Sequence, residues 1–250
     1  MTADNDSGQS GHDAPVEGNS RPVTSSQTGP HESLRERVAR HAQGRFDKPI
    51  ADYNREAFEG VNQHVREAGL PLILDSGCGT GDSSRELARR HPDHLVVGVD
   101  RSADRLSRQR TDMPTNCILV RADLLDFWRL ARQADWRLSR HYLLYPNPEP
   151  KARHLKRRFH AHPVFPDFVA LGGHIESRSN WRIYLEELAI ALAFHGRQTR
   201  LHPLDPQDRP LTLFERKYHA SGQALWRLET VDTPDTSPEN AANGPAIPPR

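Results

Sequence analysis

The sequence predicts an α/β fold in which parallel strands alternate with helices. Short aliphatic runs recur along the chain, and each is followed by a polar, helical pattern. The first run ends in an acid and three alternating glycines, over residues 72–81, and the next two runs end in Asp100 and Asp123. Strand and helix units of this length form a parallel sheet with right-handed crossovers, whose functional residues lie at the carboxyl ends of the strands.

The glycine stretch is the strongest local signal. Leu-Ile-Leu-Asp-Ser-Gly-Cys-Gly-Thr-Gly predicts a buried strand and then a loop in which Gly77, Gly79 and Gly81 let backbone approach a ligand. Asp82 and two serines then supply capping side chains for a helix. Strand, glycine loop and helix in this order indicate a nucleotide-cofactor site.

The acids around this loop distinguish between cofactors. A dinucleotide fingerprint needs a glycine where Asp82 stands, and an acid there would repel a pyrophosphate. Asp75 and Asp100 end neighbouring strands, where carboxylates suit a cationic amino acid moiety and a ribose diol, which together describe S-adenosylmethionine (SAM). Asp123 is placed to accept from an adenine amino group, although it would serve equally well as the N-cap of the next helix.

Composition divides the chain into one domain and two tails. Residues 1–30 and 231–250 are polar and proline-rich, and we expect both to be disordered because they bury too little apolar surface to offset ordering entropy. A single domain is predicted over residues 31–230. Within it, residues 31–69 show a helical pattern and are expected to cover the cofactor cleft.

The chain shows no membrane or secretion signal. No apolar run approaches the eighteen or so residues that span a bilayer, and the first residues lack an apolar segment. The two cysteines, Cys78 and Cys117, fall in the glycine loop and in a predicted strand, which fits a reducing compartment. We expect a cytoplasmic protein with no membrane contact and no metal site, and a monomer or weak homodimer.

A proline-rich, basic segment follows the fourth predicted strand. Residues 145–158 read Tyr-Pro-Asn-Pro-Glu-Pro-Lys-Ala-Arg-His-Leu-Lys-Arg-Arg. Three prolines in five residues fix a stiff loop at the expected position of a catalytic loop. Five cations follow, on a chain whose net charge is only +1. A local basic cluster beside a cofactor cleft suits a phosphate backbone, and a solvated helix start is the alternative.

Together these motifs resemble the bacterial tRNA (guanine-N7)-methyltransferases. The corresponding loop of that family reads F-P-D-P-W-x-K-x-R-H-x-K-R-R. Residues 172–176 are similar to its fifth strand, residues 179–184 to its T-D-W-x-x-Y, and residues 212–215 to its T-x-F-E. The resemblance covers about residues 72–228 and implies a SAM-dependent methyltransferase acting on tRNA.

The resemblance also implies a fold. It is the Rossmann-like, class I methyltransferase fold, with a seven-stranded, mostly parallel sheet, one antiparallel strand and helices on both faces. We expect residues 211–217 and 223–229 to supply the last strands as a hairpin about Ser221 and Gly222.

Site residues follow from the same resemblance. It implies SAM contacts from Asp75, Asp100, Asp123 and Asn147, beside the three glycines, with Asn147 as the catalytic residue. It implies tRNA contacts from a larger set, namely Lys151, Arg153, His154, Lys156, Arg157, Arg158, Asn180, Thr212, Phe214 and Glu215. Three positions depart from the family pattern: Asn147 and Asn180 replace aspartates, and Glu149 replaces an aromatic residue. Asparagine keeps an acceptor oxygen but loses the charge.

The predicted reaction is methylation of guanine N7 in the variable loop of tRNA. The N7 lone pair carries no proton, so transfer needs no general base and depends on alignment of the reacting atoms. Two alternatives stay open. One is a paralogue that methylates another RNA or a small molecule, and the other is a non-catalytic protein that binds SAM or RNA.

Overall fold

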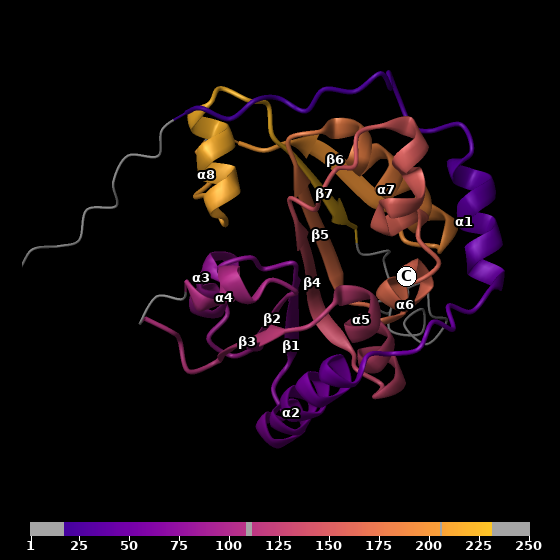
Figure 1. Ribbon diagram of the computed structural model, residues 1–250. Coiled ribbons are helices and arrows are strands. Elements are labelled where there is room, and N and C mark those ends of the chain that lie inside the picture. Colours follow the sequence, from indigo (N-terminus) through magenta and orange to yellow (C-terminus); the bar gives the residue numbers. More distant parts are fainter. Residues whose placement is uncertain (1–17, 109–111, 206, 232–250) are drawn as a thin grey trace, which may run out of the picture.

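The α/β fold is confirmed by a computed structural model, which describes residues 18–108, 112–205 and 207–231 (Figure 1). Seven strands form one sheet in the order β3-β2-β1-β4-β5-β7-β6. They are β1 (Leu72–Ser76), β2 (Leu95–Asp100), β3 (Cys117–Arg121), β4 (Leu138–Leu144), β5 (His174–Ser179), β6 (Thr199–Pro203) and β7 (Trp226–Thr230). Strand β7 runs antiparallel to both of its neighbours, and the other adjacent pairs are parallel. The prediction of one antiparallel strand near the edge is therefore confirmed.

Helices cover both faces of this sheet. They are α1 (Leu34–Gln43), α2 (Asp52–Ala68), α3 (Asp82–Arg90), α4 (Ala103–Ser107), α5 (Leu124–Gln133), α6 (Phe165–Ala170), α7 (Arg182–Phe194) and α8 (Leu213–Ala220), with 3-10 turns η1 (Ala152–Arg157) and η2 (Phe159–Ala161). None of the helices in the described ranges is long and apolar enough to cross a membrane.

The core lies in two layers, one on each face. Strands β1 and β2 are buried at every position, which explains their nearly continuous aliphatic sequence. Leu74 points into a large cluster that includes residues of α1, α2, α5, α6 and α7, whereas its neighbour Ile73 packs with Leu87 of α3 on the other face. This alternation follows from the two-residue period of a strand.

The predicted C-terminal hairpin is wrong. Residues 213–220 form α8, and the partner of β7 is β6, which precedes α8 in the chain. Thr212 caps α8, since its Oγ1 accepts a hydrogen bond from the Glu215 backbone N–H at 3.0 Å. Thr-x-x-Glu is a capping pattern, and the local capping bond outweighs the strand preference of the aliphatic and aromatic residues around it.

The segment over residues 18–30, predicted to lie outside the fold, instead packs against it. It crosses the top of Figure 1 in indigo, from α8 to α1. Its Ser20 N–H donates to Ser221 Oγ (3.1 Å), and Ser25 Oγ donates to the Pro150 carbonyl oxygen (2.6 Å). These hydrogen bonds hold this polar segment on the fold, together with Val23, which packs against the core. The remainder of the two predicted tails, residues 1–17 and 232–250, lies outside the described residues.

A buried ion pair ties this segment to the proline loop and to α7. Arg158 is 0% exposed and its Nη1 donates to Glu187 Oε2 at 2.5 Å. The same guanidinium donates to Gln27 Oε1 (2.5 Å) and to the Glu149 carbonyl oxygen (3.0 and 3.2 Å), and it lies 4.9 Å from the centre of the Trp181 ring. Three segments, namely the N-terminal segment, the proline loop and α7 with its N-cap, therefore meet at one arginine.

The Glu187 carboxylate has a full set of partners. His160 Nε2 lies 2.9 Å from Oε2, and the His31 backbone N–H donates to Oε1 at 2.9 Å. Burial alone would raise the pKa of Glu187, but hydrogen bonds from His160 and Arg158 outweigh it and lower the pKa to about 2. The group is therefore ionised throughout the neutral range.

We predict that Arg158→Met lowers the free energy of unfolding by about 3 to 5 kcal/mol, because it leaves the Glu187 carboxylate buried and uncompensated. Urea denaturation of the full chain measures this change. Lys156→Met is the matched control: Lys156 is exposed on η1, and a change of about 0.5 kcal/mol or less is expected. Equal, small effects of the two substitutions would contradict the structural role of Arg158.

Candidate functional site

The glycine loop lies at the carboxyl end of β1. Gly77, Gly79 and Gly81 all have left-handed φ angles, between +60° and +83°. At Gly81 a Cβ would also overlap the Leu119 side chain of β3. The backbone N–H groups of Gly77 and Cys78 donate to the Val99 carbonyl oxygen, at 2.8 and 3.0 Å. The loop is therefore packed directly onto β2 and β3, and a side chain at position 81 would collide with β3.

Asp100 fastens this loop from the end of β2. Its Oδ2 accepts from the Gly79 backbone N–H (3.0 Å) and from Arg105 Nη1 (3.1 Å), and its Oδ1 accepts from the Ser102 N–H (2.8 Å). The Arg105 side chain is 41% exposed, so it can move aside. Two hydroxyl donors of a ribose could take the place of Arg105 on this carboxylate.

Asp75 lies beneath the same loop and is fully buried. Its Oδ2 accepts from the hydroxyls of Ser83 (2.6 Å) and Ser84 (2.7 Å), in the first turn of α3. Burial raises the pKa of Asp75 to about 6, against the opposing effect of the two serines. Within the part of the chain that the structure describes, its Oδ1 has no hydrogen-bond partner. That oxygen is free to accept from a cationic amino group.

Asp123 acts as an N-cap. Its Oδ1 accepts from the Leu125 N–H at 2.8 Å, and its own N–H donates to Asn54 Oδ1 at 2.9 Å. This is one of the two roles that the sequence left open. An adenine contact from the same residue stays a prediction.

Two residues of the proline loop have strained backbone conformations. Tyr145 and Glu149 have φ angles of +48° and +45°, which non-glycine residues seldom adopt. Between them Asn147 is exposed, and its Nδ2 donates to Glu149 Oε1 at 3.0 Å. Glu149 also pairs with His154 (3.1 Å) and Arg157 (3.6 Å). The two loop positions that depart from the family pattern therefore contact each other.

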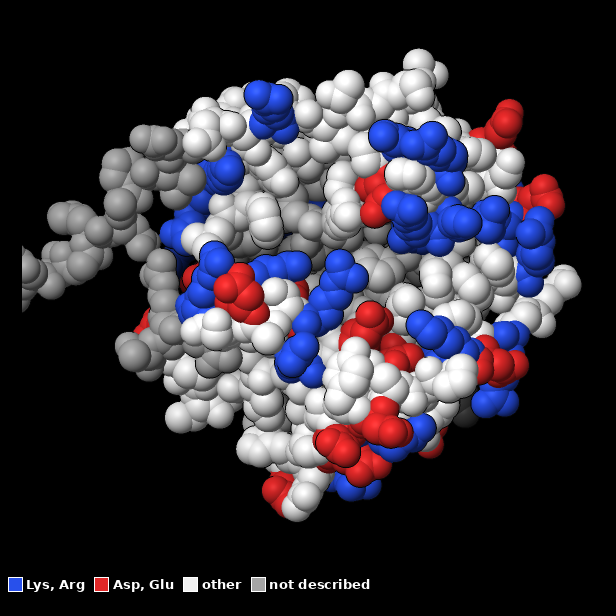
Figure 2. Space-filling model, viewed as in Figure 1, with Lys and Arg blue, Asp and Glu red and all other residues white. Residues whose placement is uncertain are grey.

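The basic cluster is exposed except for its last member. Figure 2 shows Lys and Arg side chains gathered at the upper right, over the segment that follows β4. Lys151, Arg153, Lys156 and Arg157 are exposed, and His154 is half-buried. The predicted tRNA contact from Arg158 is wrong, because this side chain is buried in the ion pair with Glu187. The local sequence does not distinguish Arg158 from the exposed cations beside it, because its partner Glu187 is 29 positions away.

Glu215 is held on the inner side of α8. It is 1% exposed, and its Oε1 accepts from Arg178 Nη1 (2.8 Å), whose Nε donates to Glu176 Oε1 (2.7 Å). Burial raises the pKa of Glu215. In the described residues its Oε2 has no hydrogen-bond partner. An ion-pair chain therefore fastens α8 to β5 and leaves one buried acceptor unused.

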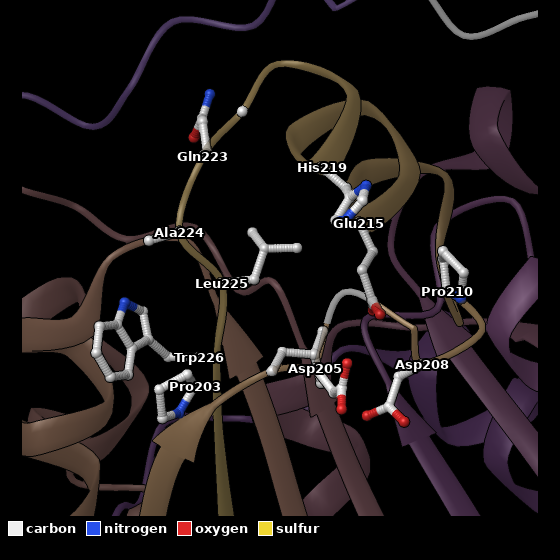
Figure 3. Close-up of a pocket in the computed structure, with 12 residues that line it drawn as sticks. Pro203, Asp205, Asp208, Pro210, Glu215, His219, Gln223, Ala224, Leu225 and Trp226 are labelled. Atoms are coloured by element: carbon white, nitrogen blue, oxygen red, sulfur yellow. The ribbon is translucent and has the colours of Figure 1, made fainter.

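Glu215 also lines a cavity of about 480 Å³ between α8 and the ends of β6 and β7 (Figure 3). Figure 3 shows the carboxylates of Asp205, Asp208 and Glu215 turned toward one another at one side of the cavity. Gln223 lines it as well and accepts from Asn180 Nδ2 at 2.8 Å. The structure thus gathers Asn180 and Glu215 around α8, and it adds two aspartates that the sequence reasoning missed because they lie in an irregular loop.

The predicted site residues fall into three groups. Asp75, Asp100 and the glycines come together at the ends of β1 and β2, whereas the proline loop and its cations follow β4, the neighbour of β1. The third group is α8, where Thr212 serves as the N-cap and Phe214 is 49% exposed. Carboxyl ends of parallel strands meet at one edge of a sheet, so the glycine loop and the basic proline loop share that edge.

The sequence is similar to those of known proteins. The family model Methyltransf_4, described as "Putative methyltransferase", matches residues 70–228. A tRNA (guanine-N(7)-)-methyltransferase of Pseudoalteromonas atlantica is 30% identical over 174 residues, which are 63% of this chain and 71% of that protein. One of Geobacillus kaustophilus is 30% identical over 186 residues, 67% of this chain and 82% of that protein.

A solved structure supports the fold independently. An antibiotic-related methyltransferase superimposes with a TM-score of 0.51 at 17% identity, covering 68% of this chain and 94% of that one. At this identity the likeness shows the fold alone. The sequence matches show that the chain belongs to the tRNA (guanine-N(7)-)-methyltransferase family.

Proposed function

We propose that the protein is a SAM-dependent methyltransferase that forms N7-methylguanine in the variable loop of tRNA. The observation that carries this proposal is the adjacency of β1 and β4, which brings the glycine loop and the basic proline loop to one edge of the sheet. The names of the relatives support the same substrate. We assign the activity to residues 31–230, together with the segment over residues 18–30.

The residues at the ends of β1 and β2 fit SAM. The unused Oδ1 of Asp75 would accept from its amino group, Asp100 would accept from its ribose hydroxyls, and the packed glycine loop would lie against it. SAM supplies an electrophilic methyl group on a sulfonium. The chain itself needs to hold guanine N7 in line with that methyl group, because N7 has no proton to remove. Asn147 is exposed in the proline loop, and we assign its side-chain oxygen as the acceptor for the guanine edge.

We also propose a location and an oligomeric state for the enzyme. The absence of a membrane-spanning helix among the described elements and the tRNA-modifying relatives support a cytoplasmic location. We propose a monomer or weak homodimer. A relative acting on another RNA or a small molecule is the second candidate, favoured by the departures at Asn147, Glu149 and Asn180.

The test is methyl transfer from labelled SAM to unmodified tRNA transcripts. We expect transfer to transcripts that contain a variable-loop guanine, and none to otherwise identical transcripts in which adenine replaces it. Transfer that is indifferent to that guanine would favour the second candidate.

We predict that Asp100→Asn weakens SAM binding by tenfold or more and leaves tRNA affinity within twofold of the wild type. An amide keeps one acceptor oxygen but turns a donor toward the ribose or the glycine loop. Calorimetry with SAM and filter binding with tRNA measure the two affinities. Asp104→Asn, an exposed acid on α4, is the control, and it should change neither. Parallel losses of both affinities would contradict the assignment of Asp100 to the cofactor.

We predict that Arg153→Gln with Lys156→Gln lowers tRNA affinity and flattens its salt dependence. Each lost phosphate contact should reduce the slope of log K against log [salt] by about 0.7 to 0.9. The matched control is Arg66→Gln with Arg137→Gln. These two exposed residues lie just before β1 and β4, at the opposite edge of the sheet. If both double variants change the slope equally, the basic cluster acts only through the overall charge of the protein and does not form an RNA site.

We predict that Asn147→Asp alone lowers methyl transfer about tenfold, and that adding Glu149→Gln restores most of it. The Asn147 amide donates to the Glu149 carboxylate, so a carboxylate at position 147 would repel Glu149 and displace the loop. Single-turnover rates of the two single variants and the double variant give the coupling between the positions. Additive effects would show that the two departures from the family pattern are independent.

A further inference from the structure

A row of three aromatic rings lies between the proline loop and the surface of α8. It consists of Phe214 and Tyr218, one helical turn apart, and Tyr145 at the end of β4. The ring centres of Phe214 and Tyr218 are 6.2 Å apart with an interplanar angle of 26°, and those of Tyr218 and Tyr145 are 5.6 Å apart. We call these residues the aromatic row. Phe214, its outermost member, is 49% exposed, so its ring is accessible to a ligand.

The aromatic row is fixed at both ends. Tyr145 packs against the cluster that contains Leu87 and Ala88 of α3, the helix that follows the glycine loop. Helix α8 is fixed by the Thr212 cap and by the Glu215–Arg178 ion pair to β5. The rings are therefore held in place on the α3 side of the sheet, and little entropy is lost when a flat ligand binds against them.

The aromatic row is distinct from the neighbouring cavity. Glu215 and His219 of α8 line that cavity, whereas Phe214 and Tyr218 are one position earlier in each turn and are not among its lining residues. Successive residues on a helix point about 100° apart. Phe214 and Tyr218 therefore point in a different direction from Glu215 and His219, and Tyr145, just after β4, connects them to the edge that carries the glycine and proline loops.

The proline loop itself lacks an aromatic residue after Tyr145. Glu149 stands at the position of the family's aromatic residue, and it is engaged by Asn147, His154 and Arg157. A base taken out of an RNA stack loses its neighbours, and aromatic side chains compensate for that loss in proteins that bind single strands. A rigid aromatic surface close to the loop meets this need.

We propose that Phe214 and Tyr218, backed by Tyr145, form the surface on which the methyl-accepting base stacks. This inference rests on the proposed function and deepens it, because it assigns base positioning to α8 where the loop has lost its aromatic residue. Tyr218 is a new base-stacking residue in this assignment. Stacking accepts any base, so the surface holds the ring plane while groups at the loop select guanine.

The test compares leucine and aromatic substitutions. Phe214→Leu and Tyr218→Leu keep apolar volume but remove the ring, whereas Phe214→Tyr and Tyr218→Phe keep it. We expect each leucine variant to lose about 5- to 100-fold in kcat/KM for tRNA, and the aromatic variants to stay within about threefold. SAM affinity and the salt slope of tRNA binding should not change, since no phosphate contact is lost. Phe194→Leu, 52% exposed at the end of α7, is the matched control.

A second readout reports stacking directly. A tRNA transcript carries the fluorescent base 2-aminopurine in place of the variable-loop guanine. Its fluorescence should be quenched when the transcript binds the wild type and brighter when it binds either leucine variant. The stacking proposal would be overturned if the wild type methylates the guanine and the leucine variants keep both its kcat/KM and its quenching. Failure of the wild type to methylate any tRNA guanine would overturn the proposed function instead, and the emission test would still decide whether a base stacks on α8. Urea denaturation of Tyr218→Leu separates a loss of stacking from a loss of fold.

Discussion

The buried ion pair between Arg158 and Glu187 is the interaction on which the arrangement of the site depends. Two charges at zero exposure are favourable only when every donor and acceptor is used. Here the guanidinium reaches Glu187, Gln27 and the Glu149 carbonyl oxygen and lies over Trp181. The pair therefore joins the N-terminal segment, the proline loop and α7 behind the site, and the exposed cations of η1 project from the other side of the same turn.

This anchoring explains how the proline loop keeps an unfavourable backbone. Left-handed φ angles at Tyr145 and Glu149 cost about 1 to 3 kcal/mol each. The carbonyl oxygen of Glu149 is fixed by Arg158, and that of Pro150 accepts from Ser25. A loop held at successive carbonyl groups cannot relax into an easier conformation. For a reaction that requires alignment and no proton transfer, a rigid loop is the main contribution that the protein can make.

The parts of the fold that the sequence predicted are those that depend on local pattern. Strands β1 and β2 and the glycine loop follow from aliphatic runs, terminal acids and the steric freedom of glycine, all within ten residues. The errors have a different origin. Arg158 looks like one more surface cation until Glu187, 29 positions away, is placed beside it. The segment over residues 18–30 is polar in composition, yet its partners at Pro150 and Ser221 lie more than 120 residues along the chain. No local pattern contains such contacts.

The departures from the family pattern make physical sense as a group. An aspartate at position 147 would lie against the carboxylate of Glu149, so an amide at 147 is the change that makes an acid at 149 tolerable. That acid in turn draws His154 and Arg157 onto the loop, which gives the loop a charged and hydrogen-bonded surface in place of an aromatic one. The stacking surface is then required elsewhere, and Phe214 and Tyr218 supply it from α8. A stacking surface can be supplied by a different element without a change in the geometry of the site, provided that both elements are fixed to the same sheet. Arg158 fastens the loop and Arg178 fastens α8.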